Sequence, residues 1–213
     1  MGKSKRTHKL TDRRRRMRYA ARRLIKLAVV AAVLAALVLA DRAGIFGRAP
    51  KGDFAAYDGA EFAVVRVLDG DTLDVDTPDG GTPYTRIRLW GVDTPEMDWR
   101  NKRHQHFAPQ ATEFTRKAAS RQPVKVKLEA GRDTRDRYGR LLAFVRLGDG
   151  RVLNRLLIAE GCGYADPRFD HSRKAEYARV QRRAMKNLRG LWEEVAESDL
   201  PYYYQGKLRL PKK

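Results

Sequence analysis

The chain has 213 residues, and its 45 Lys and Arg against 26 Asp and Glu give a formal net charge of +19. This length accommodates one ordinary domain with appendages and leaves little room for two full domains. The positive charge favours polyanionic partners, nucleic acid or anionic lipid, and the single Cys162 excludes an intramolecular disulfide and a multi-cysteine metal site.

The N-terminal segment combines a basic run with an apolar run. Residues 1–26 contain twelve Lys or Arg and one acid, a net of +11 (12 − 1), so +8 (19 − 11) is left for the remaining chain. Fourteen uncharged residues follow, from Leu27 to Ala40. Together with residues 24–26 they make a helix of about 25 Å at ~1.5 Å per residue, which is the short end of a membrane span.

These runs predict a basic cytoplasmic tail over residues 1–23 and a transmembrane signal-anchor helix over 24–40. The positive flank stays in the cytoplasm, so the remaining chain is expected on the other side of the membrane. A secretory signal peptide cleaved near Ala40 is the alternative, and it also exports the rest of the chain. Residues 41–59 mix Gly, Ala, Pro and charge without a period and predict a linker.

Short alternating runs begin at Glu61 and predict a β-rich domain over residues 60–194. Five strands are expected, in the stretches EFAVVRVLD, DTLDVD, YTRIRLWGV, PVKVKLEA and RLLAFVRL. Five short strands at this spacing are typical of a small barrel. If the turn at Gly70 preserves the alternation, Val65, Asp71 and Leu73 share one face.

Three helices are expected between and after these strands. They cover PQATEFTRKAAS, VLNRLLIAEG and SRKAEYARVQRRAMKNLRG, each with apolar residues at helical spacing. The third helix also has a basic face. We expect this face to be exposed to solvent, and the alternative is that it faces nucleic acid or phosphate. The domain is therefore predicted to be α+β, followed by a basic C-terminal tail over residues 195–213 without an assigned role.

Two acidic stretches carry the candidate chemistry. In VLDGDTLDVD, Asp71 falls level with core-facing residues, where a carboxylate is costly unless a cation or hydrogen-bond donors compensate it. In RLWGVDTPE, Arg88 lies five residues before Asp93, and Glu96 follows Pro95. If the first and third strands are neighbours, Asp71 and Asp93 converge. Two carboxylates and a backbone carbonyl suit calcium, or less tightly magnesium.

Two arginines supply complementary donors. Arg88 provides a planar, permanently charged group for phosphate, and Arg140 opens a strand after Gly139 in DRYGRLLAFV. Taken singly, the acids fit an ordinary turn and Arg140 fits an ordinary surface position. Their combination in one domain points to a site for a phosphate and a hard cation.

The stretches VLDGDT, RLWGVDTPE, DRYGRLLAFV and VLNRLLIAEG, in this order and at these separations, resemble the thermonuclease or staphylococcal nuclease-like family from about Ala63 to Glu194. The resemblance implies a five-stranded OB-fold-type β-barrel with three α-helices, preceded here by one N-terminal transmembrane helix. It also implies calcium-dependent cleavage of phosphodiester bonds in DNA and RNA.

By this resemblance, the calcium ligands are Asp71, Asp93 and the backbone carbonyl of Thr94. Arg88 and Arg140 are implied to hold the scissile phosphate, where a metal and two guanidinium groups stabilise developing negative charge.

The resemblance further implies that Glu96 is the general base. Whether Glu96 deprotonates the attacking water or only orients it stays open. Arg137 and Tyr138 occupy positions where the family contacts a terminal phosphate and a nucleotide.

The expected function is a membrane-anchored or exported calcium-dependent nuclease that acts on DNA and RNA with little sequence preference, as a monomer without a protein partner. A non-catalytic nucleic-acid-binding OB module tethered to the membrane is the alternative, although relatives of that kind typically lack part of the acid and arginine set found here. A basic envelope scaffold, whose acidic cluster only stabilises a turn, is the third hypothesis.

Overall fold

A computed structural model describes residues 25–35, 52–120 and 123–210. The chain divides into two compact units, residues 1–50 and 51–213. The second unit contains all of the sheet and the predicted site residues, so it determines how those residues are placed.

The described part of the first unit is a helix over residues 25–35 with exposed side chains. In the described ranges, no helix has both the length and the apolar character that a membrane crossing requires. The predicted membrane helix over 24–40 is therefore not supported as a span. Its residues 24 and 36–40 lie outside the described part of the chain, as does the basic tail over 1–23.

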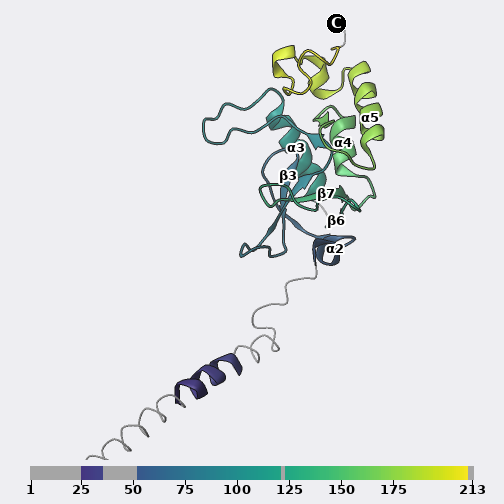
Figure 1. The fold of residues 1–213 in the computed structure, drawn as a ribbon. Coiled ribbons are helices and arrows are strands. Elements are labelled where there is room, and N and C mark those ends of the chain that lie inside the picture. The colour runs from purple at the N-terminus through teal and green to yellow at the C-terminus, as the bar shows by residue number, and fades with distance from the viewer. Residues whose placement is uncertain (1–24, 36–51, 121–122, 211–213) are drawn as a thin grey trace, which may run out of the picture. The chain divides into compact units, whose positions relative to one another are not determined.

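The second unit is built on a curled six-stranded sheet (Figure 1). Its strands are β1 Glu61–Phe62, β2 Val64–Val67, β3 Thr72–Val75, β4 Thr85–Leu89, β6 Val124–Lys127 and β7 Leu141–Arg146. Their order is β1-β6-β7-β4-β3-β2, with β4 and β7 parallel and the other pairs antiparallel. A separate two-stranded sheet joins β5 (Val92–Asp93) to β8 (Tyr164–Ala165).

The sheet curls because one run of chain serves both of its edges. β1 pairs with β6 and β2 pairs with β3, yet only Ala63 separates β1 from β2. If β1 and β2 are counted as one bent strand, the sheet has the five predicted strands. The register shifts within β2 and Val65 is 56% exposed. The predicted common face of Val65, Asp71 and Leu73 is therefore wrong, because a bulge reverses the alternation.

The three predicted helices are present, and the class is α+β as predicted. They are α3 Ala108–Ala119, α4 Leu153–Ala159 and α5 Lys174–Lys186. Three short helices were not predicted: α2 Gly52–Tyr57 and the 3₁₀ helices η1 Gly190–Glu193 and η2 Glu197–Asp199. The end of the predicted linker over 41–59 thus forms α2, which buries Tyr57 in the second unit.

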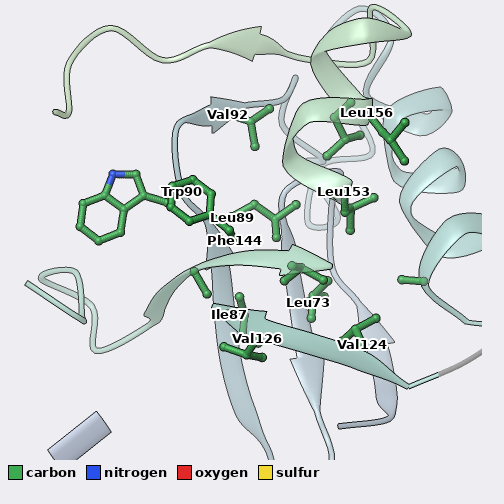
Figure 2. Packing of buried hydrophobic residues seen from close by; sticks show 14 of the residues in the cluster. Leu73, Ile87, Leu89, Trp90, Val92, Val124, Val126, Phe144, Leu153 and Leu156 are labelled. Atoms are coloured by element: carbon green, nitrogen blue, oxygen red, sulfur yellow. The ribbon is translucent and has the colours of Figure 1, made fainter. Parts of the chain in front are cut away.

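The main core lies between the strands and the helices α3 and α4. Val124 and Val126 point inward and are buried, while Lys125 and Lys127 are exposed, as the alternation predicts. Figure 2 shows strand side chains gathered with Leu153 and other apolar residues of α4 in one cluster. Burial of such side chains contributes about 1.5–3 kcal/mol each relative to exposure.

A second apolar cluster anchors the C-terminal segment. Leu200 packs with Met185 of α5 and with Trp192 of η1. The segment after residue 194, yellow in Figure 1, is therefore folded against α5 up to residue 210. The tail over residues 195–213, for which no role was predicted, therefore contributes apolar residues to the fold as far as residue 210.

Candidate active site

The antiparallel pairing of β3 with β4 brings the first acid to the first arginine. Thr72 pairs with Arg88, and the backbone N–H of Leu89 donates to the carbonyl of Asp71 at 2.8 Å. Asp71 directly precedes β3, so its side chain lies beside Arg88. The predicted convergence of the acids occurs, but through the second and third predicted strands rather than the first and third.

The guanidinium of Arg88 joins two carboxylates. Its Nη1 lies 2.9 Å from Oδ2 of Asp71, and its Nη2 donates to Oδ1 of Asp93 at 2.6 Å. Nη1 also donates to the carbonyl of Val92 at 2.6 Å. Burial disfavours the charge on Arg88, but the two carboxylates outweigh it and raise the pKa of the guanidinium. The arginine is therefore a permanent positive charge between two acids.

Asp71 is almost completely enclosed, with 2% of its surface exposed. Its Oδ2 accepts hydrogen bonds from the backbone N–H of Thr94 at 2.7 Å and from Oγ1 of Thr94 at 3.1 Å. Its Oδ1 accepts one from Oγ1 of Thr72 at 3.1 Å. Burial raises the pKa of Asp71 and Arg88 opposes that shift. The donors orient this carboxylate, and a nearby positive charge is needed to keep it ionised.

The turn before Asp71 requires glycine for space. A Cβ at Gly70 would lie 2.7 Å from Oγ1 of Thr94. The carbonyl of Gly70 also accepts a hydrogen bond from Thr115 of α3 at 2.6 Å. The Asp-Gly-Asp-Thr turn is thus pressed against Thr94 on one side and tied to α3 on the other, which fixes where Asp71 points.

Asp93 is held on its second oxygen by residues that sequence analysis did not identify. Oδ2 accepts a hydrogen bond from Oη of Tyr203 at 2.8 Å and one from Nη2 of Arg168 at 3.2 Å. Burial and the charge of Asp93 raise the pKa of Tyr203, so its hydroxyl stays protonated as a donor. These partners are 75 and 110 residues away in the chain, and a local pattern carries no signal for such contacts.

Glu96 follows Pro95 and lies close enough to Arg88 for their charges to interact. Its side chain is exposed, and its backbone N–H donates to Oε1 of Gln105 at 2.8 Å. Desolvation by the surrounding protein raises the pKa of Glu96, and the charge of Asp69 acts in the same direction, while Arg88 lowers it. A carboxylate with a raised pKa is a stronger base than an ordinary glutamate.

The loop before β7 presents the second arginine. Oδ1 of Asp136 accepts from the backbone N–H groups of Tyr138 and Arg140, and Oδ2 accepts from Nε of Arg140 at 2.7 Å. Tyr138 is 68% exposed, and Nη2 of Arg137 donates to its hydroxyl at 2.6 Å. Asp136 therefore orients Arg140 through one edge of the guanidinium, and the bonds observed among described residues leave its terminal nitrogens available.

A pocket of about 780 Å³ gathers most of these groups. Six of the eight predicted site residues line it, and the other two, Asp71 and Thr94, are buried behind it. The six are Arg88, Asp93, Glu96, Arg137, Tyr138 and Arg140. The predicted residues thus converge on one site, and the pocket also has Arg168, Phe169 and Tyr202 in its wall.

The structure brings the residues predicted to bind calcium close together. Asp71 and Asp93 share one guanidinium, and the backbone N–H of Thr94 donates to Asp71, whereas the predicted ligand is the carbonyl of Thr94. Oxygen donors of this kind fit calcium. Within the described ranges, no group of three or more His, Cys, Asp or Glu side chains is arranged to hold a metal ion.

Comparison with known proteins agrees with this geometry. Residues 86–194 match the family model described as staphylococcal nuclease homologue. The chain is 37% identical to a thermonuclease of Staphylococcus hyicus over 134 residues, which are 62% of this chain and 75% of that protein. It is 39% identical to a thermonuclease of Staphylococcus intermedius over 137 residues, 63% and 77% of the two chains. It is also 30% identical to an uncharacterised endonuclease of Escherichia coli over 132 residues, 62% and 76% of the two chains.

Proposed function

The chain belongs to the staphylococcal nuclease family, and from this premise we propose that it hydrolyses phosphodiester bonds of DNA and RNA in a calcium-dependent reaction. The observation that carries the proposal is the ion-paired set of Asp71, Arg88 and Asp93 beside a pocket that also contains Glu96 and Arg140. These five groups are the types that phosphate binding and water activation require.

The two arginines are proposed to bind the scissile phosphate. Guanidinium groups match phosphate oxygens in planar, two-point contacts. Asp136 presets the orientation of Arg140, which lowers the entropy lost on binding. Arg88 is paired with Asp71 and Asp93 in this structure, so it contributes to phosphate binding once another cation compensates those acids.

Glu96 is proposed to accept a proton or a hydrogen bond from the attacking water. Its position at the pocket and its raised pKa support this role, because both favour interaction with a proton donor near neutral pH. Both possible contributions, deprotonation and orientation, predict loss of turnover when the carboxylate is replaced by an amide.

Calcium would be held by Asp71, Asp93 and the backbone carbonyl of Thr94. When bound, a divalent cation stabilises negative charge on phosphate oxygens and lowers the pKa of water. Tyr203, Thr94 and Arg88 orient the carboxylate oxygens, which supports the proposed role of these acids.

Substrate selection is proposed to depend on the phosphate backbone. Arg88 and Arg140 address phosphates rather than base edges, so little sequence preference and strong salt sensitivity follow. DNA and RNA share the phosphate that these arginines address, so both are expected substrates.

The test uses the full chain, purified in detergent, with single-stranded DNA and RNA in calcium or in EGTA. Both polymers are expected to be cut only with calcium. Glu96→Gln should lower turnover about 100-fold, the usual contribution of a general acid or base. Glu113→Gln, which removes a half-exposed α3 carboxylate outside the pocket, is the matched control.

Intact substrate under all conditions would contradict the proposal. DNA binding without cleavage, unchanged by Glu96→Gln, would instead favour a non-catalytic binding module.

Export is a separate part of the proposal. A basic run over residues 1–26 is followed by an apolar run from Leu27 to Ala40. This order is typical of an N-terminus that is targeted to the membrane. We propose that these runs place residues 41–213 outside the cytoplasm, either on an uncleaved anchor or after cleavage near Ala40.

A further inference from the structure

The C-terminal segment brings a pair of tyrosines to the pocket. Tyr202 and Tyr203 follow η2, and their rings meet edge to face with centroids 5.4 Å apart. Tyr203 is buried, whereas Tyr202 is 71% exposed and lines the pocket. Because Tyr203 bonds to Asp93 and Leu200 packs in the second apolar cluster, the exposed ring has a fixed attachment beside the site.

Arg168 forms the centre of an aromatic group. Its guanidinium carbon lies 4.3 Å from the ring centroid of Tyr203, 5.7 Å from that of Tyr202 and 5.5 Å from that of Phe169. Two carboxylates fix the same guanidinium, since Nη2 lies 2.7 Å from Asp166 and 3.2 Å from Asp93. These ion pairs fix the position of the guanidinium, and its cation–π contacts hold the neighbouring rings in place.

The two outer rings of this group are exposed to the pocket. Phe169 is 54% exposed and Tyr202 is 71% exposed. Each ring is large enough to stack on a base. Exposed aromatic rings beside a fixed arginine are the usual platform for stacked bases of a single strand, because every base has a π-face. Both rings lie in the same pocket as Arg88 and Glu96.

We propose that Arg168, Phe169 and Tyr202 form a subsite that stacks a nucleobase of the strand flanking the cleaved phosphodiester bond. This inference rests on the proposed nuclease function and adds the C-terminal segment to the substrate site. Stacking requires a base that is free of its duplex neighbours, so the ligand is single-stranded nucleic acid. The subsite reads no base edge, in keeping with weak sequence preference.

This subsite shares no residue with the one that the family resemblance assigns to Arg137 and Tyr138. There, the guanidinium carbon of Arg137 lies 4.8 Å from the ring centroid of Tyr138. The pocket therefore contains two arginine–aromatic groups from chain segments far apart. A strand whose phosphate is bound by Arg88 and Arg140 could contact the aromatic rings of both groups.

The test compares two probes with equal backbone charge. The full chain in detergent and EGTA, where cleavage is blocked, is titrated with a fluorescent single-stranded DNA hexamer and with the same hexamer made entirely of abasic nucleotides. We expect Tyr202→Ala to weaken binding of the base-bearing hexamer about tenfold and to leave the abasic hexamer unchanged, since stacking one base contributes about 1–3 kcal/mol. Tyr202→Phe should retain wild-type binding of both probes because it keeps the ring.

The matched control is Phe54→Ala, which removes a partly exposed ring of α2 outside the pocket and should change neither probe. Thermal unfolding monitors the fold of each variant. Equal binding of the base-bearing hexamer by wild type and Tyr202→Ala would overturn the inference, and so would equal weakening of both probes. Failure of the nuclease proposal is distinct, because the wild-type chain would then cleave no substrate when calcium is restored.

Discussion

Asp93 illustrates how single residues set the chemistry of this site. Its two oxygens have different partners: Arg88 binds one, and Tyr203 and Arg168 bind the other. Asp71, in contrast, is satisfied by threonine donors and Arg88. Both carboxylates are thus oriented before any ligand binds, and variants of their partners should change binding without touching the carboxylates themselves.

Removal of the Tyr203 hydroxyl tests the orientation of Asp93. Tyr203→Phe deletes one of the donors to Oδ2, and loss of such an outer partner typically weakens metal binding about tenfold. Calcium titration calorimetry measures this change. Tyr202→Phe is the control, because it removes the exposed hydroxyl of the neighbouring ring. Equal calcium affinity of the two variants would contradict an orienting role for Tyr203.

Removal of the Arg88 guanidinium tests the ion-paired set. Arg88→Met leaves two acids without their shared cation, and breaking a buried pair in this way costs about 3 kcal/mol or more in the free energy of unfolding. Urea unfolding in EGTA measures the loss. Calcium should recover part of it, because a divalent cation compensates the same acids.

Arg86→Met provides the comparison for Arg88→Met. Asp74 also loses an arginine in that variant, but Arg66 continues to bind it at 2.5 Å. The destabilisation should therefore be smaller and independent of calcium. If Arg88→Met were as stable as Arg86→Met, the guanidinium would not be what stabilises the two acids.

At the scale of elements, close approaches decide how the helices and loops support the site. The turn after α4 lies against the start of η1. In the loop between β8 and α5, His171 packs against Gly91, which lies between β4 and β5. These contacts join segments on which Asp93 and its partners depend. Two substitutions test them separately.

Gly161 tests the crossing of α4 with η1. A Cβ there would lie 1.9 Å from the carbonyl oxygen of Arg189, and φ is +67°. Gly161→Ala should therefore lower the free energy of unfolding by more than about 2 kcal/mol, since strain and overlap add. Gly150→Ala shares the positive φ, +84°, but has open space, so it should cost about 1 kcal/mol. Chemical denaturation compares them, and equal losses would show that the close approach has no energetic effect.

His171 makes stability depend on pH. Burial between Phe144, Tyr177 and Gly91 lowers its pKa from 6.5, and Lys174 adds to this, while Glu129, Asp166 and Asp170 oppose it. Above pH 6.5 the imidazole is neutral in both folded and unfolded chains and makes no pH-dependent contribution. Below that pH the unfolded chain binds the proton more readily, so stability falls as pH falls.

Unfolding of wild type and His171→Phe between pH 5 and 8 tests this direction. The phenylalanine keeps an aromatic ring between Phe144 and Tyr177 and removes the titrating group. The stability of the variant should therefore change less between pH 6.5 and lower values than that of wild type. Identical pH profiles would assign the dependence to other groups.

At the scale of the whole molecule, the basic and apolar runs lie in the N-terminal part of the chain, and the predicted site lies in the part that follows. Residues 1–26 have a net charge of +11 and precede the apolar run, whereas the fold and its pocket lie in the unit over residues 51–213. In the pocket, by contrast, arginines are paired with acids: Arg140 with Asp136 and Arg168 with Asp166. The pocket therefore has no excess of positive charge like that of residues 1–26.

The proposed location is tested in cells that express the full chain. An anchored protein should stay in the membrane pellet after carbonate extraction, and added protease should digest residues 41–213 without cell lysis. Replacing Val33 and Leu34 by Lys should release the chain from the membrane, because each charge in a span costs about 2.5–3.5 kcal/mol. A soluble wild-type protein with an intact N-terminus, protected from external protease, would contradict both the anchor and the cleaved-signal alternatives.

Much of the site was predictable because its residue types lie in short, ordered stretches. Asp71, Arg88, Asp93 and Glu96 fall within 26 consecutive positions of the chain, and Arg140 directly precedes β7. The alternating strands and the three longer helices were likewise recognisable from period. The bend at Ala63, the two-residue strands β5 and β8 and the 3₁₀ helices were not, since such short elements depend on contacts rather than period.

The sequence alone determined which groups are available: two aspartates, two arginines and a glutamate at spacings that suit a metal and a phosphate. The tertiary structure decided which of them meet. Only folding pairs β3 with β4, so that one guanidinium binds Asp71 and Asp93, and only folding carries Tyr203 and Arg168 to the far oxygen of Asp93. The physical reason is that strand pairing and side-chain packing act across the chain, whereas periodicity records only what each segment buries.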